Sequence, residues 1–167
     1  MADKTTFTPD EWKQITESVM MASMAVTAAD PSGLWGLLKE SFAGGSALVQ
    51  AKSDASANSL VKAVADDFAT SDGQKRVREG VQQKLSGKKP AEVKAASIDA
   101  LRQVSGLLDT KAPADAAAFK SWLRQISQRV ADAANEGGGL LGFGGVPVSE
   151  AEKATLSEIS GALKLAA

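Results

Sequence analysis

Residues 8–30 read TPDEWKQITESVMMASMAVTAAD and predict the helix around which the chain folds. Thr8 stands at the N-cap position, Pro9 at the first helical position, and Glu11 where it completes a capping box. Apolar residues then recur at three-and-four spacing, and in the second half of the segment they surround the helix on nearly every side. A helix that is apolar all round is buried, so we expect this one to lie at the centre of the fold.

Further helices are expected from the same spacing, bounded by proline, which lacks an amide donor, and by glycine, which adopts the left-handed conformation that ends helices. They begin near Ser32, Leu48, Leu60, Val77, Pro90, Pro113 and Ser149. The helix at Leu60 is expected to stop around Ser71-Asp72-Gly73 and to form a helical hairpin with the one at Val77. No segment alternates apolar and polar residues at period two, so no β-sheet is predicted.

The predicted fold class is therefore all-α, a compact multi-helix bundle of about seven or eight helices that forms one domain over residues 1–167. With 44% hydrophobic and 23% charged residues, the chain can bury enough apolar surface to order itself. We expect disorder in residues 1–7, a hydrophobic staple between Phe7 and Trp12, and a Gly-rich loop over residues 137–147. Ser149 and Glu152 are placed to form a second capping box.

The charge balance gives no overall attraction to nucleic acid or to an anionic membrane, because Lys+Arg 19 against Asp+Glu 20 leaves a net charge of -1. The polar start, Met1 to Pro9, does not resemble a secretory signal, so a cytoplasmic location is expected. The longest uncharged segment of the first helix, Ser18 to Ala29, is shorter than the roughly 20 apolar residues of a transmembrane helix.

Three residue types are missing, since the chain has no His, Cys or Tyr. Their absence removes the usual imidazole base, thiol nucleophile and phenol acid, and also the ligands of zinc, haem and iron-sulfur sites. Asp66, Asp67 and Asp72 lack the spacing of a calcium loop. We therefore expect no enzyme activity, no catalytic residue, no cofactor and no metal, although two carboxylates from distant helices could still form an acid-base pair.

The stretch from Gly137 to Gly145 begins with a literal G-x-G-x-x-G string. A dinucleotide-binding fingerprint needs a preceding strand and a helix that opens within it, and here a long helix precedes and Pro147 follows. One interpretation is that the glycines cap the long helix and that Leu140, Leu141 and Phe143 pack against the bundle. The other is an exposed loop that docks on a partner or a membrane surface through Leu140, Leu141 and Phe143.

A basic segment runs from Lys75 to Lys94, with seven cations against two glutamates and hence a local charge of +5. Its candidate anion contacts are Lys75, Arg76, Arg78, Lys84, Lys88 and Lys89. No aromatic residue interleaves with these charges, as a platform for single-stranded nucleic acid requires. The alternatives are phosphate binding and an ordinary solvated helix face, and the second is the more common.

The three methionines Met20, Met21 and Met24 can fill the core or form an adaptable surface for a partner helix. Pockets for small ligands often lie between the helices of bundles. Candidates to line such an apolar pocket here are Met20, Met24, Trp35, Phe119 and Trp122.

The C-terminal third of the chain resembles the ending of small uncharacterised bacterial helical proteins. The residues that carry the resemblance are Phe119, Trp122-Leu123, Val130-Ala131, the run from Gly137 to Gly145, and Val148-Ser149 followed by Glu152. The segment Val148 to Glu152 is also similar to tellurite-resistance-type helical proteins, in which a loop leads into a helix with an early glutamate. The acidic metal-site pattern of that family is not evident here, so no binding residue is transferred. The resemblance implies a bacterial cytoplasmic protein with an all-helical fold.

Taken together, these patterns favour a non-enzymatic helical protein that acts through contacts with a protein partner or through self-association. One alternative is a protein that binds a small apolar ligand between its helices. Another is binding of an anion or a nucleic acid through the basic segment, although the near-neutral overall charge disfavours nucleic acid.

Overall fold

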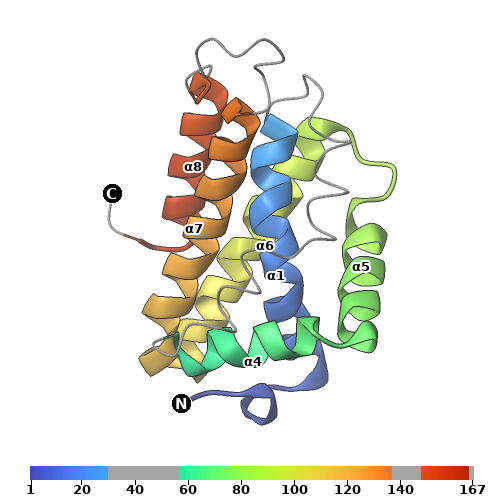
Figure 1. The fold of residues 1–167 in the computed structure, drawn as a ribbon, viewed down its shortest axis with the longest axis vertical. Coiled ribbons are helices and arrows are strands. Elements are labelled where there is room, and N and C mark those ends of the chain that lie inside the picture. The colour runs from blue at the N-terminus through green and yellow to red at the C-terminus, as the bar shows by residue number, and fades with distance from the viewer. Residues whose placement is uncertain (30–56, 137–147, 166–167) are drawn as a thin grey trace.

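The computed structural model describes residues 1–29, 57–136 and 148–165. Within these ranges it contains a short 3-10 helix and six α-helices: η1 Lys4–Thr6, α1 Pro9–Ala29, α4 Ser59–Phe68, α5 Ser71–Leu85, α6 Pro90–Lys111, α7 Pro113–Glu136 and α8 Glu150–Ala162 (Figure 1). No strand occurs in this part of the chain, and the all-α prediction is confirmed. The described part has six α-helices rather than seven or eight, and the helices predicted near Ser32 and Leu48 lie outside the described residues.

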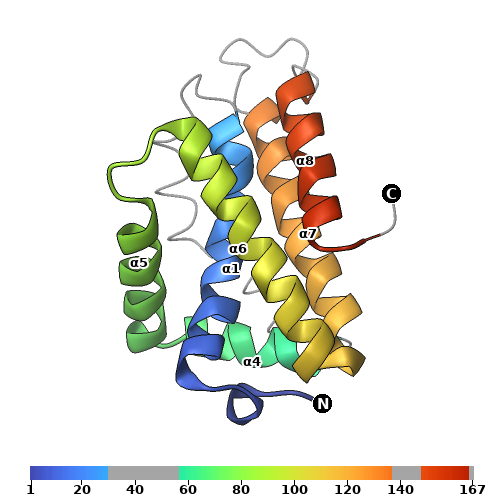
Figure 2. The ribbon, with the colours of Figure 1, turned by 180° about the vertical axis from the view of Figure 1, so that it is seen from behind.

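Figure 1 places α1 in the middle of the molecule, with α6, α7 and α8 running along it. α1 packs against these three helices and against α5, and its contact with α6 is the most extensive. Viewed from behind, α5 stands at one flank, and α4 lies across the end of the bundle near the N-terminal residues (Figure 2). Of the described helices, none is both long and apolar enough to cross a membrane.

The central position of α1 follows from its sequence. Ile15, Thr16, Glu17, Ser18 and Val19 are consecutive, and all are buried. Successive residues of an α-helix are rotated by about 100°, so five buried neighbours leave no side of this turn facing water. The prediction that the first helix is central is confirmed, and its buried surface includes polar side chains as well as apolar ones.

Both predicted capping boxes are present. At α1, the Thr8 amide donates to Glu11 Oε2 (2.8 Å) and the Glu11 amide donates to Thr8 Oγ1 (3.3 Å). At α8, the Ser149 amide donates to Glu152 Oε2 (2.9 Å) and the Glu152 amide donates to Ser149 Oγ (3.2 Å). Proline stands first in α1, α6 and α7, where its missing amide hydrogen has no helical partner to lose.

The turn between α4 and α5 differs from the prediction. α4 ends at Phe68, and Ser71-Asp72-Gly73, expected to terminate it, form the first turn of α5. The Thr70 hydroxyl caps this turn by accepting a hydrogen bond from the Gly73 amide (3.0 Å). Figure 1 shows α4 lying across the end of the bundle while α5 runs along its flank, so the two helices do not form the predicted helical hairpin.

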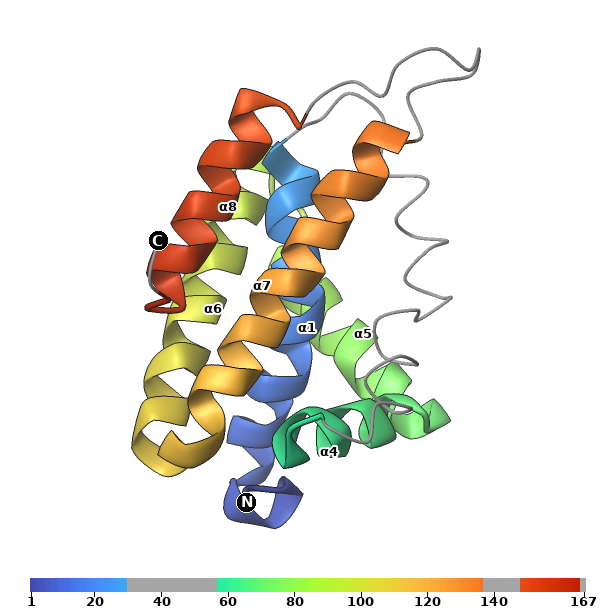
Figure 3. The same ribbon diagram turned by 60° about the vertical axis from the view of Figure 1, so that its left-hand side comes forward.

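The N-terminal residues lie at the same end of the molecule as α4 (Figure 3). Ala2 and Phe7 are buried, and the Phe7 ring centroid lies 6.2 Å from that of Trp12, as expected of a hydrophobic staple. Residues 1–7 were expected to be disordered, but the Ala2 amide donates to the carboxylate of Asp115 on α7 (2.7 Å). Local sequence could not reveal this anchor, because its two residues are 113 positions apart.

The Asp115 carboxylate accepts three hydrogen bonds from two segments of the chain. Its Oδ2 accepts from the Ala2 amide, and its Oδ1 accepts from Asn58 Nδ2 (2.7 Å) and Ser59 Oγ (3.0 Å) at the start of α4. The residue is buried and lies in the first turn of α7, where the helix dipole favours a negative charge. This carboxylate therefore fastens both the N-terminal segment and α4 to the bundle.

Candidate interaction surface

α5 has one side that faces the bundle and one that faces solvent. The side towards α1 is formed by small residues, and Gly73, Val77, Gly80 and Val81 are buried. The opposite side carries charged and amide side chains, such as Arg78, that are exposed. This helix and the turn that follows it supply most cations of the basic segment, so α5 determines where that segment lies on the molecule.

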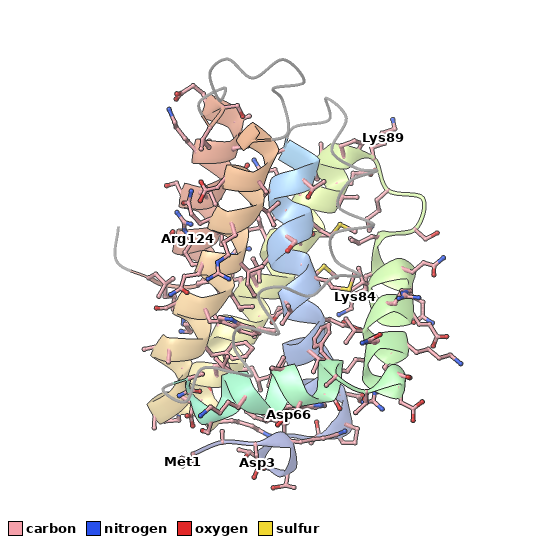
Figure 4. All side chains as sticks on the ribbon, viewed as in Figure 1. Met1, Asp3, Asp66, Lys84, Lys89 and Arg124 are labelled. Carbon is pink, nitrogen blue, oxygen red and sulfur yellow. The ribbon has the colours of Figure 1, made fainter. Side chains whose placement is uncertain are left out.

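A buried carboxylate lies beneath α5. Glu17 of α1 is only 1% exposed, and its Oε2 accepts a hydrogen bond from Lys84 Nζ at 2.6 Å. Lys13 Nζ lies 3.8 Å from the other oxygen, Oε1, which has no hydrogen-bond partner among the described residues. Lys84 sits on the last turn of α5, beside α1 (Figure 4). One ion pair thus joins the central helix to the peripheral one across a sequence distance of 67 residues.

The absence of a side chain at Gly80 leaves room for the Glu17 carboxylate against α5. A Cβ atom built on Gly80 would lie 1.8 Å from Glu17 Oε1, so any side chain would displace the carboxylate from its place beneath α5. Glu17 is not among the candidate residues predicted from the sequence. A signal existed, because Glu17 is the last charged residue before the half of α1 that is apolar on nearly all sides, but nothing local indicates that Lys84 is its partner.

Gly80→Ala is expected to lower the free energy of unfolding by about 1 kcal/mol, since the loss from displacing the buried carboxylate exceeds the gain in helix propensity. Gly106→Ala in α6 is the matched control. Its added Cβ would meet nothing within 4 Å, so this variant should gain about 0.5 to 1 kcal/mol. Urea unfolding followed by circular dichroism measures the free energy of unfolding of both variants. Equal effects of the two substitutions would contradict the close packing of α5 on Glu17.

Most cations of the basic segment are held in ion pairs. Arg76 Nη2 lies 3.0 Å from both carboxylate oxygens of Asp67. Lys84 pairs with Glu17 as described above. The remaining pairs are Lys75 with Glu79 at 4.0 Å and Lys94 with Glu158 at 2.8 Å. These contacts are internal to the protein, so the predicted cluster of anion contacts is only partly free to meet a ligand.

Three cations of the segment remain exposed and form no ion pair within the described residues: Arg78, Lys88 and Lys89. Arg78 lies on the solvent side of α5, and the two lysines lie in the turn that leads to α6. Figure 4 shows Lys89 at the upper end of this side of the molecule, next to the start of α6. We call these three residues the outer α5 surface.

Asp67 connects α4, α5 and α1. It accepts hydrogen bonds from Arg76 and from the indole Nε1 of Trp12 (3.2 Å), and Lys4 Nζ lies 3.3 Å away. Burial by itself would raise the pKa of Asp67, but the hydrogen bonds from Arg76, Trp12 and Lys4 outweigh it and hold this pKa below 3.8. This carboxylate is therefore occupied by structural partners.

The residues proposed to line an apolar pocket fall on two helices. Met20 and Met24 are half-buried and lie one turn apart on α1. Phe119 and Trp122 lie on α7 with ring centroids 5.4 Å apart, and Phe119 is fully buried whereas Trp122 is half-buried. Trp35 lies outside the described residues. Phe119 therefore belongs to the hydrophobic core.

The proposed partner loop, Leu140, Leu141 and Phe143, also lies outside the described residues. Among the residues that are described, the only exposed large apolar side chain is that of Met1. No group of three or more carboxylates in the described ranges could hold a metal ion. In the described ranges, the exposed side chains other than that of Met1 are therefore charged, polar or small.

Comparison of the chain with family models, with curated proteins and with solved structures finds no match.

Proposed function

We propose that the protein is a non-enzymatic, cytoplasmic binding protein that acts through contact with another protein, and that the outer α5 surface forms part of the contact. The observation that carries this proposal is the set of three exposed cations, Arg78, Lys88 and Lys89, that remain after the neighbouring cations are used in ion pairs. Complementary charge guides association between proteins. The partner would present acidic side chains to this flank.

A protein partner fits this surface better than a nucleic acid does. Proteins that bind nucleic acid through its backbone neutralise roughly six to ten phosphates, and the outer α5 surface offers three cations. Asp72 and Glu79 are exposed on the same helix and would repel a phosphate chain. A surface of mixed charge is typical of the rim of protein-protein interfaces. Nucleic-acid binding through this segment is therefore the weaker alternative.

Self-association would have to use polar contacts if it involved the described surface, because Met1 is the only large apolar side chain exposed there. A stable interface usually has an apolar centre with a polar rim. This argument favours a partner of different chemistry over a second copy of the same chain.

The triple variant Arg78→Gln, Lys88→Gln and Lys89→Gln is expected to weaken partner capture about tenfold or more, since loss of charge at an interface reduces the rate of association. The control is Arg102→Gln, Arg129→Gln and Lys153→Gln, which removes three exposed cations from α6, α7 and α8, two of which form ion pairs within their own helices. Each triple variant is used to capture partners from the protein's own cell extract after nuclease treatment, and mass spectrometry quantifies the captured proteins. Light scattering checks that all variants keep the same molar mass.

The proposal is wrong if the two triple variants capture the same proteins to the same extent. Loss of all capture after nuclease treatment would instead point to a nucleic acid. The other alternative, a small apolar ligand between the helices, has less support because Phe119 is part of the core. Native mass spectrometry of the purified protein would reveal such a ligand as added mass.

A further inference from the structure

α5 differs from the other long helices in how little apolar surface holds it. Its buried residues are Gly73, Val77, Gly80 and Val81, and two of these have no side chain. α6, by comparison, buries five aliphatic side chains: Val93, Ile98, Leu101, Val104 and Leu108. Since hydrophobic stabilisation scales with the apolar area removed from water, α5 is attached to the described bundle less strongly than α6.

The polar contacts of α5 are also of a kind that water can replace. Glu17 is buried, one of its oxygens accepts no hydrogen bond from the part of the chain that the structure describes, and its partner Lys84 is 44% exposed. Burial of a carboxylate carries a desolvation penalty that its ion pair must offset. If α5 moved away, Glu17 would regain water at both oxygens and that penalty would be relieved.

The start of α5 is tied to α4, because Arg76 binds Asp67, so a movement of α5 away from α1 would pivot at this end. Only Ala69 and Thr70 lie between α4 and α5. The turn between α5 and α6 contains Gly87 at φ 74°, a backbone conformation that glycine adopts without strain. α4 has its own attachment to the bundle through Asp115, and it does not depend on α5 for this contact.

We propose that α5 is a hinged helix that undocks from α1 as a unit while the rest of the bundle stays folded, and that the Glu17–Lys84 ion pair controls how often it does so. Cooperative opening of one weakly held element below the threshold of global unfolding is a general property of proteins. In this protein the opening would uncover Glu17 and the part of α1 that lies beneath Val77 and Val81.

A single cysteine can report this opening, because the chain contains none. Val81→Cys places a thiol on the buried side of α5, and Val104→Cys places one on the buried side of α6. Both positions are at most 3% exposed, and both substitutions exchange one small apolar side chain for another. The measurement is the rate of labelling by a thiol reagent under native conditions. We expect the thiol at position 81 to react about 100-fold faster or more.

The role of the ion pair is tested in the same two backgrounds. Lys84→Met should accelerate labelling at position 81 about tenfold or more and leave position 104 unchanged, because a charge-assisted hydrogen bond contributes at least this factor. Lys75→Met is the control, since Lys75 lies on the same helix and, within the described ranges, pairs only with Glu79 of α5 itself. It should change neither rate by more than about threefold.

Hydrogen exchange on the unsubstituted protein provides an independent measurement, in case a cysteine at position 81 itself loosens α5. The amides of the second half of α5 should exchange about 100-fold faster than those around Leu101 of α6. Equal exchange of α5 and α6, or equal labelling at positions 81 and 104, would overturn the proposal. So would a Lys84→Met variant that raises both labelling rates by the same factor.

Discussion

Asp115→Ala is expected to lower the free energy of unfolding by about 3 kcal/mol, because it removes the buried acceptor of three hydrogen bonds. The Ala2 amide, Asn58 Nδ2 and Ser59 Oγ would lose their shared partner together. The first turn of α7 would also lose a favourable negative charge. Urea unfolding at neutral pH measures the loss.

Asp132→Ala is the control for this substitution, since Asp132 is an exposed acidic residue of the same helix that accepts a hydrogen bond from Gln128 at 2.9 Å. It should change stability by no more than about 0.5 kcal/mol. A loss at Asp115 as small as that at Asp132 would show that this carboxylate does not fasten the N-terminal segment and α4.

The pH dependence of stability provides a second readout of Asp115. Burial raises its pKa, but the hydrogen bonds from Ala2, Asn58 and Ser59 outweigh burial and hold the pKa below 3.8. A carboxyl group with a lowered pKa in the folded state contributes stability above its unfolded pKa and loses it as the pH falls through the folded value. Between about pH 5 and about pH 2, Asp115→Ala should therefore lose less stability than the unsubstituted protein does.

Phe119→Ala is expected to produce the other large loss, about 4 kcal/mol, because it would leave a cavity in the core. Phe119 is fully buried. Phe119→Leu, which keeps much of the side-chain volume, should lose only about 1.5 kcal/mol or less. Thermal and urea unfolding of both variants test the expectation.

The result for Phe119 also bears on the function. A loss below about 1 kcal/mol for Phe119→Ala would mean that the ring faces open space and not packed neighbours. That outcome would favour binding of an apolar ligand between the helices over contact with a partner protein. A loss near the expected value would leave the ring as part of the structural core.

The parts of the fold that could be predicted from sequence are those that neighbouring residues determine. The capping boxes at Thr8 and Ser149 and the helices that start at Pro90 and Pro113 needed only local patterns. The central position of α1 was predicted from its second half, where apolar residues lie on nearly every side. These features depend on contacts within a few positions of one another, where sequence spacing and spatial distance agree.

The candidate site was harder to predict, because it depends on ion pairs between residues that only tertiary packing brings together. Lys84 was singled out as an anion contact, yet its partner is Glu17, 67 residues earlier. Arg76 was singled out for the same reason, and Asp67 binds it. A basic segment and an isolated acidic residue give no local sign that they meet, so charge patterning overestimated the number of free cations.

The central place of α1 also has a consequence for how the protein is made on the ribosome. About 120 residues separate the end of α1 at Ala29 from the start of α8 at Glu150, and at 5 to 20 residues per second their synthesis takes roughly 6 to 24 s. Throughout that interval the helices that cover α1 are incomplete. Glu17 and Ser18 are buried in the finished protein, but in the nascent chain their polar side chains can bind water. This hydration reduces the tendency of the exposed α1 segment to aggregate before α6, α7 and α8 surround it.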